Sequence, residues 1–89
     1  MTDFRKDTVV VFPDGQELLI SSVELRSPEF HSGIPRFQTL VFPSKFGIPI
    51  TNHEVYGELH FSKEEARFRH QEIVRVLLSM GLLPYIKAD

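Results

Sequence analysis

The spacing of apolar residues predicts a β-hairpin at the start of the chain. Residues 7–12 carry a β-branched and aromatic run that ends at Pro13-Asp14-Gly15. Proline and aspartate suit the first turn positions and glycine suits the left-handed one, so residues 16–25 should return antiparallel to the first strand. Within that second strand the apolar alternation shifts by one residue between Ile20 and Val23, which predicts a β-bulge or bend.

Two further strands are predicted in the middle of the chain. Residues 36–42 are apolar on both faces, which is typical of a central strand. Pro43 should end that strand, and residues 44–52 should be irregular because they contain a glycine and a second proline. Residues 54–61 alternate cleanly, which predicts a half-buried strand with one wetter face. The wetter face would carry Tyr56, Glu58 and His60, and the other face Val55, Gly57, Leu59 and Phe61.

One helix is predicted over residues 63–80. Ser62 is a suitable N-cap, and Glu65 three residues later would complete a capping box. Gly81 suits the position after the last turn, and a proline at 84 prevents the helix from resuming. At 100° per residue, one apolar stripe of this helix contains Ala66, Ile73, Leu77 and Met80.

His70 falls within this apolar stripe. A titratable ring in such a place must find a hydrogen-bond partner or remain neutral. We expect His70 to be buried, neutral at pH 7, and bonded to a backbone carbonyl or to a side chain such as Glu65 or Gln38. The other interpretation of His70, which we weigh below this one, is a general base or a metal ligand lining a pocket under the helix.

Together these elements predict an α+β fold in one domain over residues 1–89. Four mainly antiparallel strands, over 7–12, 16–25, 36–42 and 54–61, would form a sheet that begins with the hairpin. The helix would pack on one face of this sheet. It would be too short to cover both faces, so the second apolar face of the central strand would need loops or another subunit.

Composition narrows the function further. The formal net charge of −2 gives no bulk attraction for phosphate, so nucleic-acid binding is not expected. The chain has no cysteine, and its four histidines show no ligand spacing, so we expect neither a metal site nor a cofactor. It has no long apolar run and no signal-peptide pattern at its start, which predicts a cytoplasmic protein that does not enter membranes.

A candidate contact surface lies on the polar side of the helix. Phe68 is almost opposite Ala66, so it cannot reach the core, and it is surrounded by charged side chains. We expect Phe68, with Arg67, Arg75 or Glu72, to form part of a partner-binding surface with a charged rim. The alternatives without a binding role are that Phe68 is simply exposed to solvent and that the charges stabilise the helix through i,i+4 pairs.

Two motifs carry a resemblance. Residues 37–42 read Phe-Gln-Thr-Leu-Val-Phe, and residues 62–70 read Ser-x-Glu-Glu-Ala-x-x-x-His. In this order, over about half of the chain, they resemble a family of short uncharacterised proteins encoded by bacteriophages and prophages. Gln38 stands where those proteins carry an acidic residue. The resemblance implies a phage or prophage context and suggests that loop His31 approaches helical His70.

These observations support three hypotheses of function. The leading one is a small non-enzymatic accessory protein that binds a host or phage macromolecule, plausibly as an inhibitor. The second is a small-molecule binder or minor enzyme with a pocket near His31, His70 and Gln38. The third is a structural homodimer, because self-association through the sheet would cover apolar surface that one helix leaves open. The sequence contains no nucleophile elbow, phosphate loop or paired-carboxylate motif, so we expect no enzyme.

Overall fold

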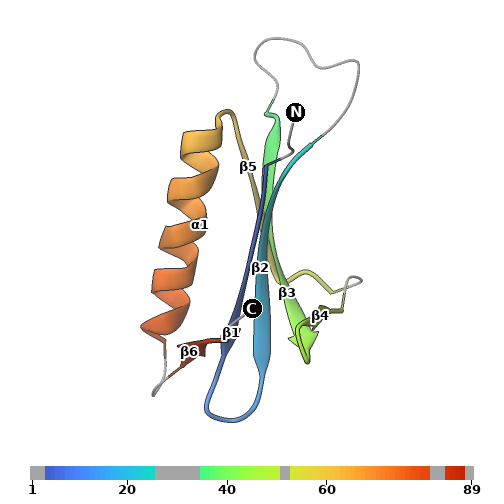
Figure 1. Ribbon diagram of the computed structural model, residues 1–89, viewed down its shortest axis with the longest axis vertical. Coiled ribbons are helices and arrows are strands. Elements are labelled where there is room, and N and C mark those ends of the chain that lie inside the picture. Colours follow the sequence, from blue (N-terminus) through green and yellow to red (C-terminus); the bar gives the residue numbers. More distant parts are fainter. Residues whose placement is uncertain (1–3, 26–34, 51–52, 81–83, 88–89) are drawn as a thin grey trace.

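The chain folds into an antiparallel sheet with one helix packed on one face (Figure 1). The computed structural model describes residues 4–25, 35–50, 53–80 and 84–87. The elements are β1 (Arg5–Val11), β2 (Glu17–Glu24), β3 (Phe37–Lys45), β4 (Ile48–Pro49), β5 (Tyr56–His60), α1 (Lys63–Leu78) and β6 (Tyr85–Ile86). The α+β fold predicted from the sequence is therefore confirmed.

β3 lies inside the sheet, as its two apolar faces predicted. The strands follow the order β4-β3-β2-β1-β6, and β5 pairs with the same side of β3 as β4 does. β5 runs along Phe37–Val41, and β4 along the last two residues of β3. The sequence predicted four strands. The two additional strands, β4 and β6, have two residues each and are too short for a periodicity to reveal.

The β1–β2 hairpin forms as predicted. Gly15 has a φ of 89°, in the left-handed region, and its N–H donates to the carbonyl of Phe12 over 2.9 Å. The predicted bulge in β2 is wrong. Glu17–Glu24 pairs in one unbroken register with β3, and all but the last of these residues pair with β1. β2 is central and carries apolar side chains on both faces, so its apparent change of phase reflects two buried faces.

β3 continues beyond the end predicted at Pro43. Pro43 lies within the strand, opposite Leu18 of β2, and its carbonyl accepts from the N–H of Ile50. Its backbone thus faces the β4 side, so the missing N–H of proline costs no bond to β2. Phe46 and Gly47, with φ of 56° and 79°, turn the chain into β4.

The alternation predicted for β5 is present, but its faces are reversed. Glu58 and His60 point toward α1, and His60 is almost fully buried. Gly57 and Leu59 occupy the opposite, solvent-exposed face. The expectation was wrong because α1 covers the polar side chains of β5. In an alternating strand, polar residues are predicted to face solvent, and the sequence pattern does not show that a helix lies over them.

α1 begins as the capping box predicted. The Ser62 hydroxyl accepts from the N–H of Glu65 over 3.1 Å. The helix ends two residues before the predicted boundary, and Met80 is exposed, so Met80 is not part of the buried stripe as predicted. The larger apolar cluster joins α1 to the three central strands: Val10, Ile20, Val41, Ile73 and Val74.

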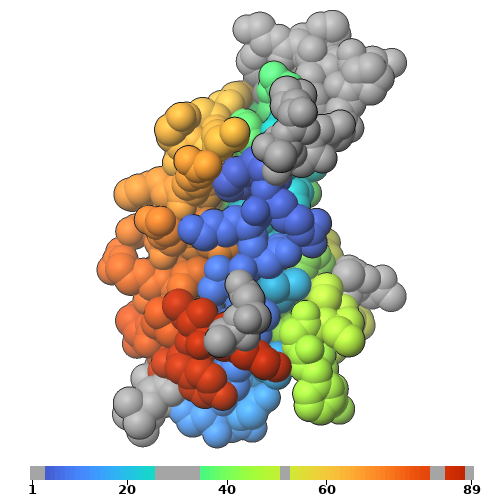
Figure 2. Space-filling model, viewed as in Figure 1, coloured from blue at the N-terminus to red at the C-terminus, as the bar shows by residue number. Residues whose placement is uncertain are grey.

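The space-filling view shows α1 lying directly against β1, with β6 near the C-terminal end of the helix (Figure 2). None of the helices in the described parts of the chain is long and apolar enough to span a membrane.

Candidate functional site

A chain of five polar side chains is buried where α1 meets the sheet. Four strands and the helix each contribute one member: Thr8, Ser22, Thr39, His60 and His70. The three strand hydroxyls point inward because their positions share the parity of core residues on the same strands, such as Val10, Ile20 and Val41. These five side chains separate the apolar cluster described above from a second one formed by Phe4, Phe37 and Ala66.

His70 uses both ring nitrogens. Nε2 lies 2.8 Å from the Thr8 hydroxyl, and Nδ1 lies 2.7 Å from the Ser22 hydroxyl. Only 1% of the residue is exposed. Burial, together with the nearby Lys6 ammonium, lowers the pKa of His70 to about 4, so the ring is neutral at pH 7 as expected.

The series of hydrogen bonds continues from Ser22 across β3 to β5. The Ser22 and Thr39 hydroxyl oxygens are 2.6 Å apart, and Thr39 lies 3.0 Å from Nε2 of His60. Beyond His60, carboxylate oxygens of Glu58 and Glu65 each lie 3.5 Å from one of its ring nitrogens. A hydrogen-bonded path thus crosses the molecule from β1 to the β5 edge.

The single proton of each hydroxyl links the tautomers of the two histidines. If His70 donates from Nδ1 to Ser22, then Ser22 donates to Thr39 and Thr39 to Nε2 of His60. The proton of His60 is then on Nδ1, which faces the carboxylate of Glu65. In the opposite direction both rings carry the proton on Nε2. In either direction the shared hydroxyls place a proton on the same nitrogen of the two rings.

The burial of Ser22 and His70 determines what this arrangement can do chemically. Ser22 and His70 contact each other as a nucleophile and a general base would. Ser22, however, is fully buried between the sheet and the helix, so a substrate has no access to its hydroxyl. The contact is structural: it satisfies polar groups that would otherwise be costly to bury.

The partners that the sequence predicted for His70 are wrong. Thr8 and Ser22 hold the ring, in place of Glu65, Gln38 or a backbone carbonyl. Gln38 precedes Thr39 in β3 and so lies on the opposite face of the sheet from His70. His31 lies outside the described residues. The structure links His70 to His60 through the hydroxyls of Ser22 and Thr39. The signal available in the sequence was the set of hydroxyl residues at inward strand positions.

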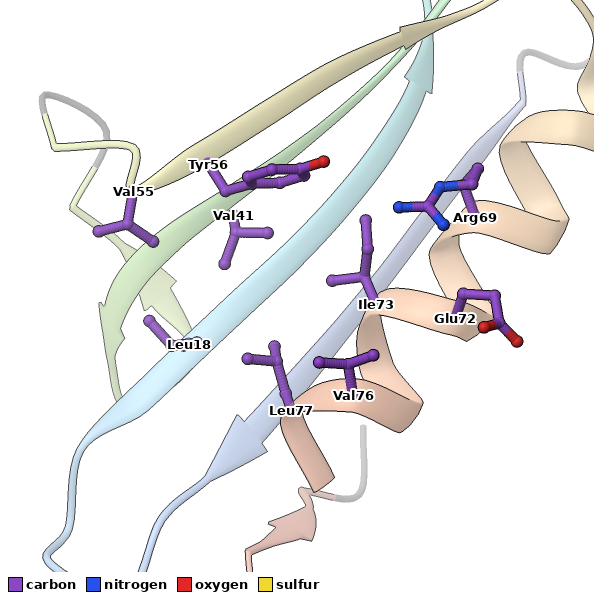
Figure 3. Close-up of a pocket in the computed structure, with 9 residues that line it drawn as sticks. All are labelled: Leu18, Val41, Val55, Tyr56, Arg69, Glu72, Ile73, Val76 and Leu77. Atoms are coloured by element: carbon purple, nitrogen blue, oxygen red, sulfur yellow. The ribbon is translucent and has the colours of Figure 1, made fainter. Parts of the chain in front are cut away.

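A groove lies beside the network, between α1 and the β3–β5 side of the sheet. It encloses about 370 Å³. Figure 3 shows Val55 and Tyr56 facing the helix across it, with Arg69 and Glu72 along the helix. Its other lining residues are apolar: Leu18, Val41, Ile73, Val76 and Leu77.

The charges along this groove are already paired. Arg69 donates to both carboxylate oxygens of Glu58, over 2.8 and 3.0 Å, and this pairing lowers the pKa of Glu58. The Tyr56 hydroxyl donates to the same carboxylate over 2.6 Å. Glu72 is held by Arg75 one turn along the helix. The groove therefore offers an apolar surface with a neutral rim, which suits an apolar side chain better than a free ion.

A second cleft, of about 390 Å³, opens on the other side of the helix, toward β1. His70 and Thr8 form part of its lining, and Lys6 supplies a positive charge. The apolar part of the lining consists of Val74, Leu78 and Ile86.

The residues predicted to contact a partner lie on the outside of α1. Phe68 is 60% exposed. Arg67 stacks over the ring of Phe4 at 5.7 Å, whereas Glu72 and Arg75 pair with each other. Phe68 and Glu72 are four residues apart and share one helix face, and Glu72 also lines the groove. Arg67 therefore contributes to the core edge, and the other three form a continuous surface.

The chain has no match among protein-family models, curated proteins or solved structures. Within the described residues, no three histidine, aspartate or glutamate side chains are grouped closely enough to hold a metal ion.

Proposed function

We propose that this protein is a small non-enzymatic accessory domain that binds another protein and acts as an inhibitor of it. The contact surface would be the outer face of α1 together with the adjoining groove. The observation that carries the proposal is a path of exposed side chains on α1, from the apolar Phe68 across the Glu72–Arg75 ion pair to the apolar Val76, which also lines the groove.

The exposure of this path supports a binding role. Phe68 and Val76 are 60% and 49% exposed, and they lie two helical turns apart on the outer side of α1. A large aromatic side chain beside charged neighbours is typical of an interface anchor. The groove next to it provides the concave part, into which an apolar side chain of the partner would insert.

The buried hydrogen-bond network supports the same proposal, because it holds in place the helix that carries the contact surface. Its hydroxyls and rings are used by one another and enclosed, so they stabilise the position of α1 on the sheet. A helix held in this way would lose little conformational entropy on binding. The phage or prophage context implied by the sequence resemblance stays a prediction, and it supplies the choice of lysate for the test.

The test is affinity capture from a bacterial host lysate with matched variants. Phe68→Ala removes the exposed anchor, and Val76→Asp places a charge at the groove. Both should lose the captured protein while remaining folded, as circular dichroism measures. Phe46→Asn, on the β3–β4 turn, removes a phenylalanine that is more exposed than Phe68 and lies away from α1, and it should retain the partner. Capture that is equal for all four proteins would contradict the proposed surface.

A second candidate function is small-molecule binding in the β1-side cleft. The observation in its favour is that Thr8, His70 and Lys6 meet an apolar wall there. An aliphatic carboxylate would place its charge near Lys6 and its chain against Val74. Titration with medium-chain fatty acids, followed by NMR shifts of these residues, would support this function if Lys6→Gln abolished the shifts.

A further inference from the structure

We infer that β5 pairs with β5 of a second copy of this chain, so that two sheets join edge to edge about a two-fold axis through Glu58. This inference goes beyond the proposed function and concerns a different surface, the free edge of the sheet. In the described part of the chain, β5 pairs only with β3, and its other edge has no strand partner.

The backbone supplies the pairing groups. The carbonyls of Val41 and Pro43 in β3 face away from β2, toward Val55 and Ile50. Odd-numbered residues of β3 thus bond toward the β5 side, and in register they oppose Tyr56, Glu58 and His60. Antiparallel alternation then turns the N–H and C=O groups of Gly57 and Leu59 outward.

Two such edges complement each other in one antiparallel register. With Glu58 opposite Glu58, Gly57 of each copy lies opposite Leu59 of the other. All the outward N–H and C=O groups of these two residues then find partners, four hydrogen bonds in total. Val55, just before β5, adds no further hydrogen bond in this register, because its N–H already donates to the carbonyl of Val41.

The side chains fit the same register. A Cβ at Gly57 would lie only 2.8 Å from Cδ2 of Leu40, so Leu40 already covers this glycine. Leu59 is 52% exposed on the same face. Opposite the glycine of the other copy, Leu59 would meet Leu40 there, because no side chain separates them. Each edge thus has a projecting leucine and a notch that accepts it.

Charge is balanced at the axis. Two carboxylates directly opposite each other would repel in a bare strand pair. Here each Glu58 is bonded through both oxygens to its own Arg69, so two neutral ion pairs meet. Either guanidinium can also bridge to the carboxylate of the other copy. A second copy is therefore the occupant that this edge matches in backbone, shape and charge.

Cysteine crosslinking tests the register directly, because the chain has no cysteine of its own. Side chains that face each other across an axis in an antiparallel pair lie close enough for a disulfide. Glu58→Cys should form a covalent dimer under mild oxidation. Phe68→Cys places a cysteine at an exposed position on α1, away from this edge, and should stay largely uncrosslinked.

Light scattering of the purified wild-type protein, without any partner, provides the second measurement. A dimer predicts a mass approaching twice 10.3 kDa as concentration rises. Leu59→Lys should reduce the mass to that of the monomer without changing the circular dichroism spectrum. The inference is overturned if the wild type stays monomeric, if Leu59→Lys remains dimeric, or if Phe68→Cys crosslinks as well as Glu58→Cys. None of these outcomes depends on the helix-surface proposal.

Discussion

At the scale of single residues, polar side chains occupy the layer where α1 meets the middle of the sheet. Thr8, Ser22 and Thr39 stand at strand positions that would ordinarily carry apolar residues, and each hydroxyl is within hydrogen-bond distance of a histidine. The two rings are compatible with burial because every strand hydroxyl in the layer is matched to one of them. Removing one hydroxyl should therefore affect both of its neighbours.

Ser22→Ala should lower the free energy of unfolding by about 1–3 kcal/mol, because it leaves His70 Nδ1 and the Thr39 hydroxyl each without a buried partner. Urea denaturation measures this loss. Ser21→Ala is the matched control: Ser21 is the preceding residue on the opposite face of β2, so its replacement should change stability by no more than about 0.5 kcal/mol. Equal effects would show that the network does not stabilise the fold.

The lowered pKa of His70 predicts a pH dependence of stability. The folded pKa is about 4 and the ordinary value 6.5, so between these pH values only the unfolded chain binds the proton. Stability should fall as the pH falls from 6.5 to 4, by about 3 kcal/mol in total, and this contribution should be constant below pH 4. Denaturation at several pH values measures it. His70→Gln should show a shallower dependence in this window; an unchanged slope would contradict the assignment.

At the scale of elements, two turns connect the strands with opposite residue choices. The β1–β2 turn places a glycine at its left-handed position, Gly15. The β3–β4 turn places Phe46 there, at φ 56°, followed by Gly47. A side chain with a Cβ is strained in this region, and Phe46 is largely exposed, so packing does not compensate.

Phe46→Gly should raise the free energy of unfolding by about 0.5–1 kcal/mol, because it relieves left-handed strain and removes little buried surface. Gly15→Ala should lower it by about 1 kcal/mol for the converse reason. Thermal or urea denaturation of the two variants measures both signs. If Phe46→Gly destabilises the protein, the phenylalanine makes a contact that outweighs its backbone strain.

At the scale of the whole molecule, one helix must cover one face of a sheet that is wider than itself. α1 crosses the middle strands, and a concave space remains on each side of it: the groove at β3 and β5, and the cleft at β1. The attachment of α1 depends on an apolar cluster toward each end of the helix and on the histidine network between them. The residues that face outward are free for contacts with other molecules.

Substitutions in α1 should therefore differ sharply in their effect on stability, according to whether the residue faces the sheet or the outside. Ile73→Ala should cost about 2–5 kcal/mol, because it opens a cavity in the main apolar cluster. Val76→Ala, three residues later and half exposed, should cost less than about 1 kcal/mol. Denaturation of the two variants compares them. Similar losses would mean that the groove is closed in solution.

The sequence alone determined the elements whose signals are local. The turn at Gly15, the N-cap at Ser62 and the central place of residues 37–42 follow from backbone preferences and from apolar spacing within short segments. These features depend on neighbours in the chain, so they can be derived without knowledge of the fold. The burial and neutrality of His70 also followed, because its place in an apolar stripe restricted it to those states.

Only the tertiary structure decided which polar residues meet. The alternation of residues 56–60 was clear, yet which face would be buried depended on what α1 placed above it, and His60 turned inward to join Thr39. The partners of His70 are 62 and 48 residues away in the chain, so no local pattern connects them. Contacts of this kind depend on how separate elements stack. For the same reason the groove, the reversed β5 faces and the free edge became visible only in the folded chain.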